Sequence, residues 1–263
     1  MRVCPAVTVI PNVRLLGLDF DDLDVAAAAA LLAARPAEAP FSYVVTPNAD
    51  HLVRLARDPA LAQVYRNAGL RLLDSRVVAG GARLLGLRAP RVAPGSDLTE
   101  WLLTQHLQPA ERVTIVGLRT RWLPALVTRC CLGPPAHYDP PMGFLFDRVA
   151  FATTVDFVLS HPARFILLAV GSPQQEVLAA TIAATGRATG TGLCIGASLE
   201  FLAGATRRAP PWMQRSGVEW LYRLSHDPRR LARRYLLHSP AVFSLLLLER
   251  YGRRPDQSRS AKL

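Results

Sequence analysis

Short runs rich in valine, isoleucine and leucine alternate with longer stretches of mixed apolar and polar residues along most of this chain. The short runs are typical of buried strands, and the longer stretches have the spacing of amphipathic helices. We expect strands at Val13 to Leu16, Tyr43 to Thr46, Leu70 to Leu73, Val113 to Val116, Phe165 to Val170 and Gly192 to Ile195. We expect helices at Leu23 to Ala34, Ala49 to Gly69, Val77 to Leu85, Asp97 to His106, Arg121 to Cys131, Phe151 to Ser160 and Gln174 to Thr185. This alternation predicts an α/β, Rossmann-like fold with a mostly parallel sheet and flanking helices.

The alternation ends near Ile195, and a segment of different character follows. It reads RRAPPWMQRSGVEWLYRLSHDPRRLARRYLLHSPAVFSLLLLERYGRR, and it is broken into short helices by Pro210, Pro211, Pro228 and Pro240. We therefore expect an α/β core at residues 1–205 and a helical, basic and aromatic C-terminal appendage at residues 206–263. The appendage is expected to be a mobile membrane-docking lid that can leave the core without exposing it.

Composition and charge narrow the choice of partner. The 263 residues are 50% hydrophobic, which is enough for a packed core. A formal net charge of +11 and a pI near 10.5 indicate an anionic partner. Nucleic acid, an acidic membrane surface and a phosphorylated small molecule all fit. Almost all the basic residues are arginine, with Lys262 the only lysine, so charge alone leaves these alternatives open.

The chain shows no pattern of a disulfide framework, a zinc site or a membrane span. Its cysteines, at positions 4, 130, 131 and 194, form no CxxC pair, and we expect reduced thiols in a cytosolic protein. The first residues lack the pattern of a signal peptide, and no stretch reaches about 18 consecutive apolar residues. The late apolar run Ala241 to Leu248 is expected at most to lie in a membrane interface.

Four predicted strands end in small or hydrogen-bonding residues. The segments are VVTPNADH, RLLDSR, ILLAVGSPQQE and LCIGASLEFLAG. In a parallel sheet, ligands collect at the carboxyl ends of the strands, where backbone amides and helix N-termini can hold phosphate. The candidate donor-binding residues at these ends are Thr46, Asn48, Gly171, Ser172, Gln175, Glu176 and Gly196. The chain has neither GxGxxG nor GxxxxGK[ST], which argues against an ordinary dinucleotide site or a P-loop ATPase.

Together and in this order, these segments resemble the WecG/TagA/CpsF family of bacterial glycosyltransferases. The resemblance runs from about Phe41 to Tyr235 and includes the PGSDL turn at Pro94 to Leu98 and the arginine-rich and tryptophan-rich run that ends in RRLARRY. It implies transfer of a hexose or an N-acetylhexosamine, of N-acetylmannosamine type, from a UDP-sugar to a polyprenyl-diphosphate-linked saccharide. It also implies cell-wall or exopolysaccharide synthesis by an enzyme peripheral on the cytoplasmic face of the bacterial plasma membrane. A homo-oligomer stays open.

Glycosyl transfer needs a base for the incoming hydroxyl group and stabilisation of the departing diphosphate. Asp74, at a strand end, is the candidate base, and it matches the catalytic aspartate of the family that the chain resembles. The alternative is a structural cap for the helix that follows. We expect neither a metal nor another cofactor, because the candidate ligands Asp19, Asp21 and Asp22 precede a helix, where acidic side chains serve the helix dipole equally well.

Arginine can stabilise the diphosphate in place of a metal, since its planar fork holds phosphate oxygens and keeps its charge. The candidates for contact with diphosphate or anionic lipid are Arg207, Arg208, Arg215, Arg223, Arg230 and Arg233. We expect some to fold over the nucleotide and the rest to face an anionic membrane surface. A nucleic-acid-binding protein that uses this basic segment is the alternative function. No RNP, helix-turn-helix or zinc motif supports it, so we expect no nucleic-acid partner.

Overall fold

A computed structural model describes residues 10–108, 111–206, 209–210, 213, 219–226 and 240–252 of the chain. Within these residues, six strands form one parallel sheet in the order β4, β3, β8, β7, β5, β6. The strands are β4 (Leu70–Arg71), β3 (Ser42–Val45), β8 (Thr191–Cys194), β7 (Phe165–Ala169), β5 (Val113–Gly117) and β6 (Ala136–Tyr138). The predicted α/β fold with a parallel sheet is confirmed.

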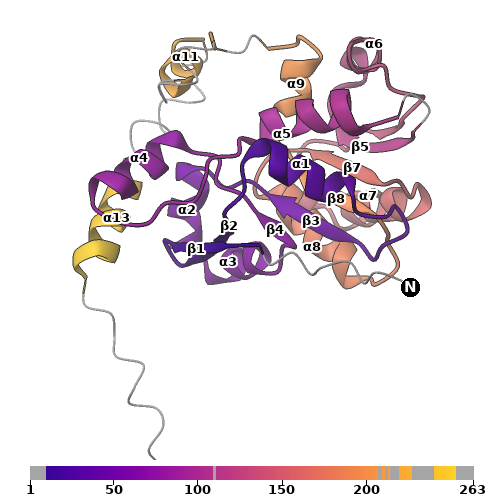
Figure 1. Cartoon of the computed structure of the whole chain (residues 1–263). Helices are drawn as coiled ribbons and strands as arrows, with labels where there is room; N and C mark the ends of the chain where they lie inside the picture. Colours follow the sequence, from indigo (N-terminus) through magenta and orange to yellow (C-terminus); the bar gives the residue numbers. More distant parts are fainter. Residues whose placement is uncertain are drawn as a thin grey trace, which may run out of the picture.

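Helices cover both faces of this sheet (Figure 1). One face carries α2 (Ala49–Leu55), α3 (Pro59–Arg66), α4 (Arg76–Leu84), α7 (Arg148–Ser160) and α8 (Gln174–Ala184). The other carries α1 (Val25–Ala33), α5 (Gly95–Trp101), its π-helical extension η1 (Leu102–His106), α6 (Leu123–Cys130) and α9 (Ser198–Leu202). The shorter or later elements are η2 (Thr120–Trp122), η3 (Phe144–Phe146), α11 (Glu219–His226) and α13 (Ala241–Tyr251).

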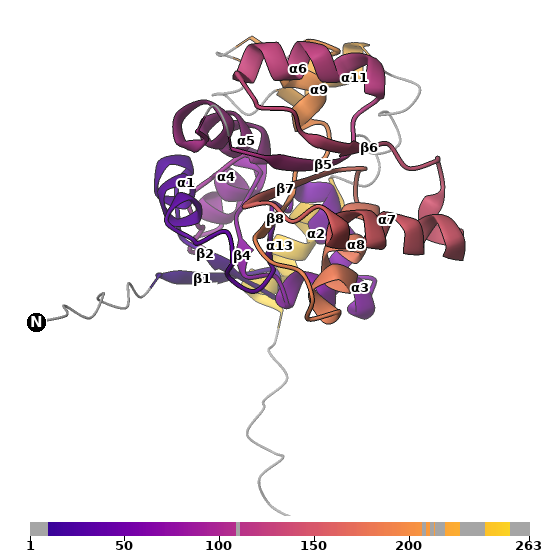
Figure 2. The ribbon, with the colours of Figure 1, turned by 90° about the vertical axis from the view of Figure 1, so that its right-hand side faces the viewer.

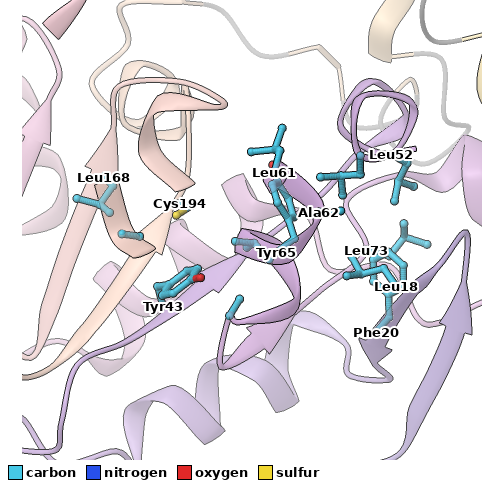
Figure 3. Close-up of a cluster of buried hydrophobic side chains, with 14 of the residues drawn as sticks. Leu18, Phe20, Tyr43, Leu52, Leu61, Ala62, Tyr65, Leu73, Leu168 and Cys194 are labelled. Carbon is cyan, nitrogen blue, oxygen red and sulfur yellow. The ribbon is translucent and has the colours of Figure 1, made fainter. Parts of the chain in front are cut away.

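The two faces arise because successive side chains of a strand point to opposite sides. In β3, Tyr43 and Val45 belong to the cluster that includes α2, α3 and α8, whereas Val44 belongs to the cluster beneath α1 and α5. Figure 3 shows the first of these clusters, in which Tyr43, Tyr65 and Cys194 come from three different elements. Both faces of the sheet are therefore packed, as a parallel sheet requires.

Two strands were not predicted from the sequence. β2 (Leu18–Asp21) pairs antiparallel with β1 (Asn12–Leu15) in a hairpin separate from the main sheet. The aspartates of β2 obscured it, and they are held by ion pairs: Asp19 with Arg14 at 2.7 Å and Asp21 with Arg71 at 3.6 Å. β6 is a short edge strand of partly buried residues between prolines, so it has little of the apolar signal of a central strand.

The predicted helix from Ala49 to Gly69 is two helices. Asp58 lies between them in an extended conformation, and its side chain accepts a hydrogen bond from the backbone N–H of Leu61. Pro59 occupies the first turn of α3, where its missing N–H costs no helical hydrogen bond. The Asp-Pro pair therefore ends one helix and begins the next.

The last helix, α13, belongs to the core. Val242 and Leu246 are fully buried, and the helix contacts α2 and α4 (Figure 1). Its Glu249 carboxylate accepts a hydrogen bond from the backbone N–H of Leu16 at 2.5 Å. The helix therefore cannot leave the core without exposing Val242 and Leu246, contrary to the expectation of a freely detachable appendage. The expected contact of Ala241 to Leu248 with a membrane interface stays a prediction. The division at residues 205 and 206 otherwise stays a prediction.

Candidate active site

A cavity of about 560 Å³ opens at the carboxyl edge of the sheet. Its lining residues follow β3, β4, β7 and β8, which is where the sequence predicted ligand-binding groups. The predicted residues that line it are Thr46, Asn48, Asp74, Gly171, Ser172, Gln175 and Gly196. Glu176 is not among them. The structure therefore brings together residues that lie as far apart as 150 positions in the sequence.

Asp74 is held at the rim of this cavity by the turn that begins α5. Its Oδ2 accepts a hydrogen bond from the backbone N–H of Gly95 at 3.3 Å, and its own N–H donates to the carbonyl of Pro47 at 3.0 Å. The N-cap of α4 is the next residue, Ser75, whose Oγ accepts from the N–H of Val78 at 3.1 Å. The capping role considered for Asp74 therefore falls to Ser75.

Gly95 lets the PGSDL turn approach the strand end closely. A Cβ atom at this position would lie 2.6 Å from the Oγ1 atom of Thr46, which is closer than such atoms approach in proteins. Thr46 itself is almost buried, at 9% exposure. The turn thus fixes Thr46 and Asp74 together on one side of the cavity.

Gly171 and Ser172 form the opposite wall. Gly171 has a φ of +80°, which a residue with a side chain adopts only with strain. The Ser172 hydroxyl accepts a hydrogen bond from Arg54 Nη2 at 3.2 Å, and the same nitrogen lies 3.2 Å from an oxygen of Asp50. The Nε of Arg54 is buried and has no hydrogen-bond partner among the described atoms. A guanidinium group is therefore present in the cavity beside the glycine-serine turn.

Asp50, His51 and Arg54 were missed by the sequence analysis, although all three line the cavity. Asn48 is the N-cap of α2, and its Oδ1 accepts hydrogen bonds from the N–H groups of Asp50 and His51. Positions 50 and 54 are one helical turn apart, so they share a face. That spacing, next to a strand end, is the signal that could have found them.

Gln175 and Glu176 have different positions despite their adjacency. Gln175 lines the cavity, and its Oε1 accepts a hydrogen bond from the N–H of Gly196 at 2.8 Å, which joins the ends of β7 and β8. Glu176 is 1% exposed and accepts a hydrogen bond from Gln175 Nε2 at 2.9 Å. Glu176 is therefore buried beside the cavity and does not line it, and its expected contact with the donor stays a prediction.

The buried side chain of Tyr65 contacts two residues that line the cavity. The Tyr65 hydroxyl lies 3.2 Å from His51 Nδ1 and 3.4 Å from Ser172 Oγ. Burial raises the pKa of Tyr65, and it also raises the pKa of Glu176, which lies close enough to influence Tyr65. Burial therefore favours the uncharged form of each group, and the Tyr65 hydroxyl acts through its hydrogen bonds.

The arginines predicted to contact diphosphate or lipid belong to the C-terminal segment. Outside the described residues lie Arg207, Arg208, Arg215, Arg230 and Arg233. Arg223 is in α11, and its side chain is also outside the description.

A second cavity of about 420 Å³ adjoins the first. The two share Ser96, Ser198 and Phe201, and the second extends between α5, α6 and α9 to Tyr222. Two ligands could thus lie side by side along the shared residues.

The described part of the chain also bears on metal binding and on membrane insertion. It contains no group of three or more histidine, cysteine, aspartate or glutamate side chains placed to hold a metal ion. Of the aspartates considered as ligands, Asp22 accepts a hydrogen bond from the N–H of Arg91 at 2.8 Å, and the other two pair with arginine as described above. Among the helices described, none has the length and apolarity to cross a bilayer.

A parallel sheet with a polar cavity at its carboxyl edge, a carboxylate at the rim and an arginine on the wall places the chain among Rossmann-like α/β proteins, in which ligands bind at the strand ends. The model of the glycosyl transferase WecG/TagA/CpsF family matches residues 13–256, and the chain belongs to that family. It is therefore a glycosyltransferase of the kind that serves cell-wall and polysaccharide synthesis, with a sugar-nucleotide donor and a lipid-linked acceptor. The match includes α13 and the segment before it, so the C-terminal residues are part of the family pattern.

Proposed function

We propose that this enzyme transfers a hexose or an N-acetylhexosamine from a UDP-sugar to a polyprenyl-diphosphate-linked saccharide. The observation that carries the proposal is the convergence of seven strand-end residues and Arg54 on one cavity of about 560 Å³, a size that suits a nucleotide-sized ligand. The adjoining cavity is the proposed place of the acceptor saccharide. The family assignment favours this function over the nucleic-acid-binding alternative.

Asp74 is the proposed base. The hydrogen bond from Gly95 fixes its carboxylate at the rim, where an acceptor hydroxyl can approach the donor. The acceptor oxygen then attacks the anomeric carbon as the bond to the diphosphate breaks, and Asp74 takes the hydroxyl proton. Attack from the side opposite the leaving group makes the proposed transfer an inverting one.

The proposed leaving-group site is the glycine-serine turn with Arg54. The turn leads into α8, an 11-residue helix whose N-terminus carries partial positive charge. The Arg54 guanidinium group, bonded to Ser172, adds a full positive charge beside it. Arginines of the segment after residue 206 are proposed to cover the diphosphate from outside and to face the anionic inner surface of the bacterial plasma membrane.

The substitution Asp74→Asn tests the base. It should leave the melting temperature and UDP binding nearly unchanged and lower turnover by roughly 10²-fold or more, because the amide cannot accept the proton. Asp139→Asn is the matched control, since Asp139 is exposed and does not line the cavity. Turnover of Asp74→Asn within a few-fold of the unsubstituted enzyme would refute the assignment.

A further inference from the structure

The segment from the end of β6 into the first turn of α7 exposes three large apolar side chains. Met142 is 100% exposed, Phe146 is 87% exposed and Val149 is 76% exposed. We call these three residues the apolar rim. Monomeric proteins rarely present several neighbouring apolar side chains so fully to water, and such groups mark interaction surfaces.

The segment is held firmly although its apolar rim is exposed. Phe144 is 2% exposed, and its ring stacks on that of Phe151 with 6.1 Å between centroids. Asp147 caps α7 by accepting hydrogen bonds from the N–H groups of Val149 and Ala150. The buried phenylalanine and the capped helix therefore fix the backbone from which the apolar rim projects.

The apolar rim follows the carboxyl end of β6, so it emerges at the same edge of the sheet as the cavity. Figure 2 shows the chain passing from β6 out to α7 at one side of the molecule. β6 pairs with β5 at Tyr138 and Val116, which brings the residues that follow β5 beside those that follow β6.

Positive charge accompanies the exposed apolar side chains. Arg119 and Arg121, after β5, and Arg148, in the first turn of α7, are all exposed. The acidic residues of the same segment are Asp139 and Asp147, and the second is engaged as the helix cap. Arginine beside apolar side chains is the combination that binds the interface of an anionic bilayer.

We propose that the apolar rim inserts into the interfacial region of an anionic phospholipid bilayer, with Arg119, Arg121 and Arg148 facing the lipid headgroups. The carboxyl edge of the sheet then faces the bilayer, and the cavity is presented to a substrate that is anchored there. The proposal rests on the proposed function for the lipid-linked acceptor. Vesicle binding needs no turnover, so the two can fail separately.

The test is sedimentation of the full chain with vesicles of phosphatidylglycerol and phosphatidylcholine. The double variant Met142→Ser, Phe146→Ser should bind these vesicles about tenfold more weakly, because two apolar side chains no longer enter the interface. Leu84→Ser is the matched control: Leu84 is 90% exposed but ends α4, the helix that follows the opposite edge strand β4 along the chain, and its loss should leave binding unchanged. Equal binding by the double variant overturns the proposal.

Two further measurements separate the alternatives. Turnover of the double variant should fall on an acceptor embedded in vesicles and stay unchanged on a water-soluble acceptor with a short lipid chain. An unsubstituted enzyme that turns over neither acceptor, with vesicle binding still dependent on the apolar rim, defeats the proposed function and supports the docking surface. Light scattering compares the oligomeric state of the unsubstituted chain with that of the double variant. If the unsubstituted chain is a dimer, the double variant is a monomer and vesicle binding is unchanged, the apolar rim joins two copies of the chain and the docking proposal is wrong.

Discussion

Glu176 has its carboxyl group where water does not reach it. The Oε1 atom accepts a hydrogen bond from Gln175, whereas the Oε2 atom is buried and has no hydrogen-bond partner among the described atoms. Burial raises the pKa of this carboxyl group, so the folded chain keeps it protonated where an exposed glutamate would ionise. This carboxyl group holds Gln175, which in turn accepts a hydrogen bond from the N–H of Gly196 at the cavity wall.

The stability of the chain should therefore depend on pH through Glu176. Its pKa in the folded chain is raised above the ordinary value of 4.5, so the stability linked to its proton is complete below that pH and is lost as pH rises through the folded pKa. The side chain of the Glu176→Gln variant stays neutral at every pH. Within this window, the unfolding free energy of the variant minus that of the unsubstituted chain should therefore increase by about 1.4 kcal/mol per pH unit. Thermal unfolding from pH 5 to 8 measures this, with the exposed Glu38→Gln as control. A constant difference across that range would show that Glu176 is ionised in the folded chain.

At the scale of elements, α13 closes one side of the core against α4. A Cβ atom at Gly81 would lie 3.0 Å from Phe243 and 3.2 Å from Leu246, so the two helices are in close contact at a glycine. Leu246 is fully buried and has little room to move. A segment that the sequence pattern placed outside the core therefore stabilises it.

A pair of neighbouring glycines in α4 tests this packing. Gly80→Ala should raise the unfolding free energy by about 0.5–1 kcal/mol, because alanine favours the helix and a Cβ atom there meets nothing within 4 Å. Gly81→Ala should instead lower it by about 1–3 kcal/mol through overpacking against α13. Chemical denaturation measures both, and adding Phe243→Ala should reduce the penalty at Gly81. Equal gains at the two glycines would mean that α13 does not lie on α4.

At the scale of the whole molecule, the proposed mechanism has arginine supply the positive charge that a metal gives many glycosyltransferases. The chain has a net charge of +11, and in the described residues the cavity contains Arg54 but no cluster of three metal-ligating side chains. A fixed guanidinium group can stabilise the departing diphosphate without a bound cation.

Activity should accordingly survive chelation. Turnover measured after dialysis against EDTA should stay within about twofold of the untreated enzyme, since removing a metal would raise the barrier only if the metal stabilised the leaving group. A parallel assay with added magnesium or manganese provides the comparison. Loss of activity in chelator that either ion restores would contradict the arginine-based mechanism.

The order of the central strands and the helices that flank them was predictable from the sequence because β3, β5, β7 and β8 are largely buried apolar runs, whereas β2 and β6 lack that signal. The strand-end residues could be predicted for the same reason: in a parallel sheet all carboxyl ends meet at one edge, so Thr46, Asp74 and Ser172 had to lie near one another. The cap of α1 is equally local, because Asp24 accepts a hydrogen bond from the N–H of Ala27, three residues further along the chain.

What depends on contacts between distant segments was decided only by the tertiary structure. Gln175 and Glu176 are adjacent polar residues in the sequence, and only the packing of α8 against the sheet turns the first toward the cavity and the second into the core. A hydrogen bond to Ser172, 118 residues away, fixes the position of the Arg54 side chain, and packing against α4 fixes the position of α13. The sequence by itself determines local periodicity and strand ends. Burial is decided by the whole fold, because the residues that cover a side chain are distant from it in the sequence and do not belong to its local pattern.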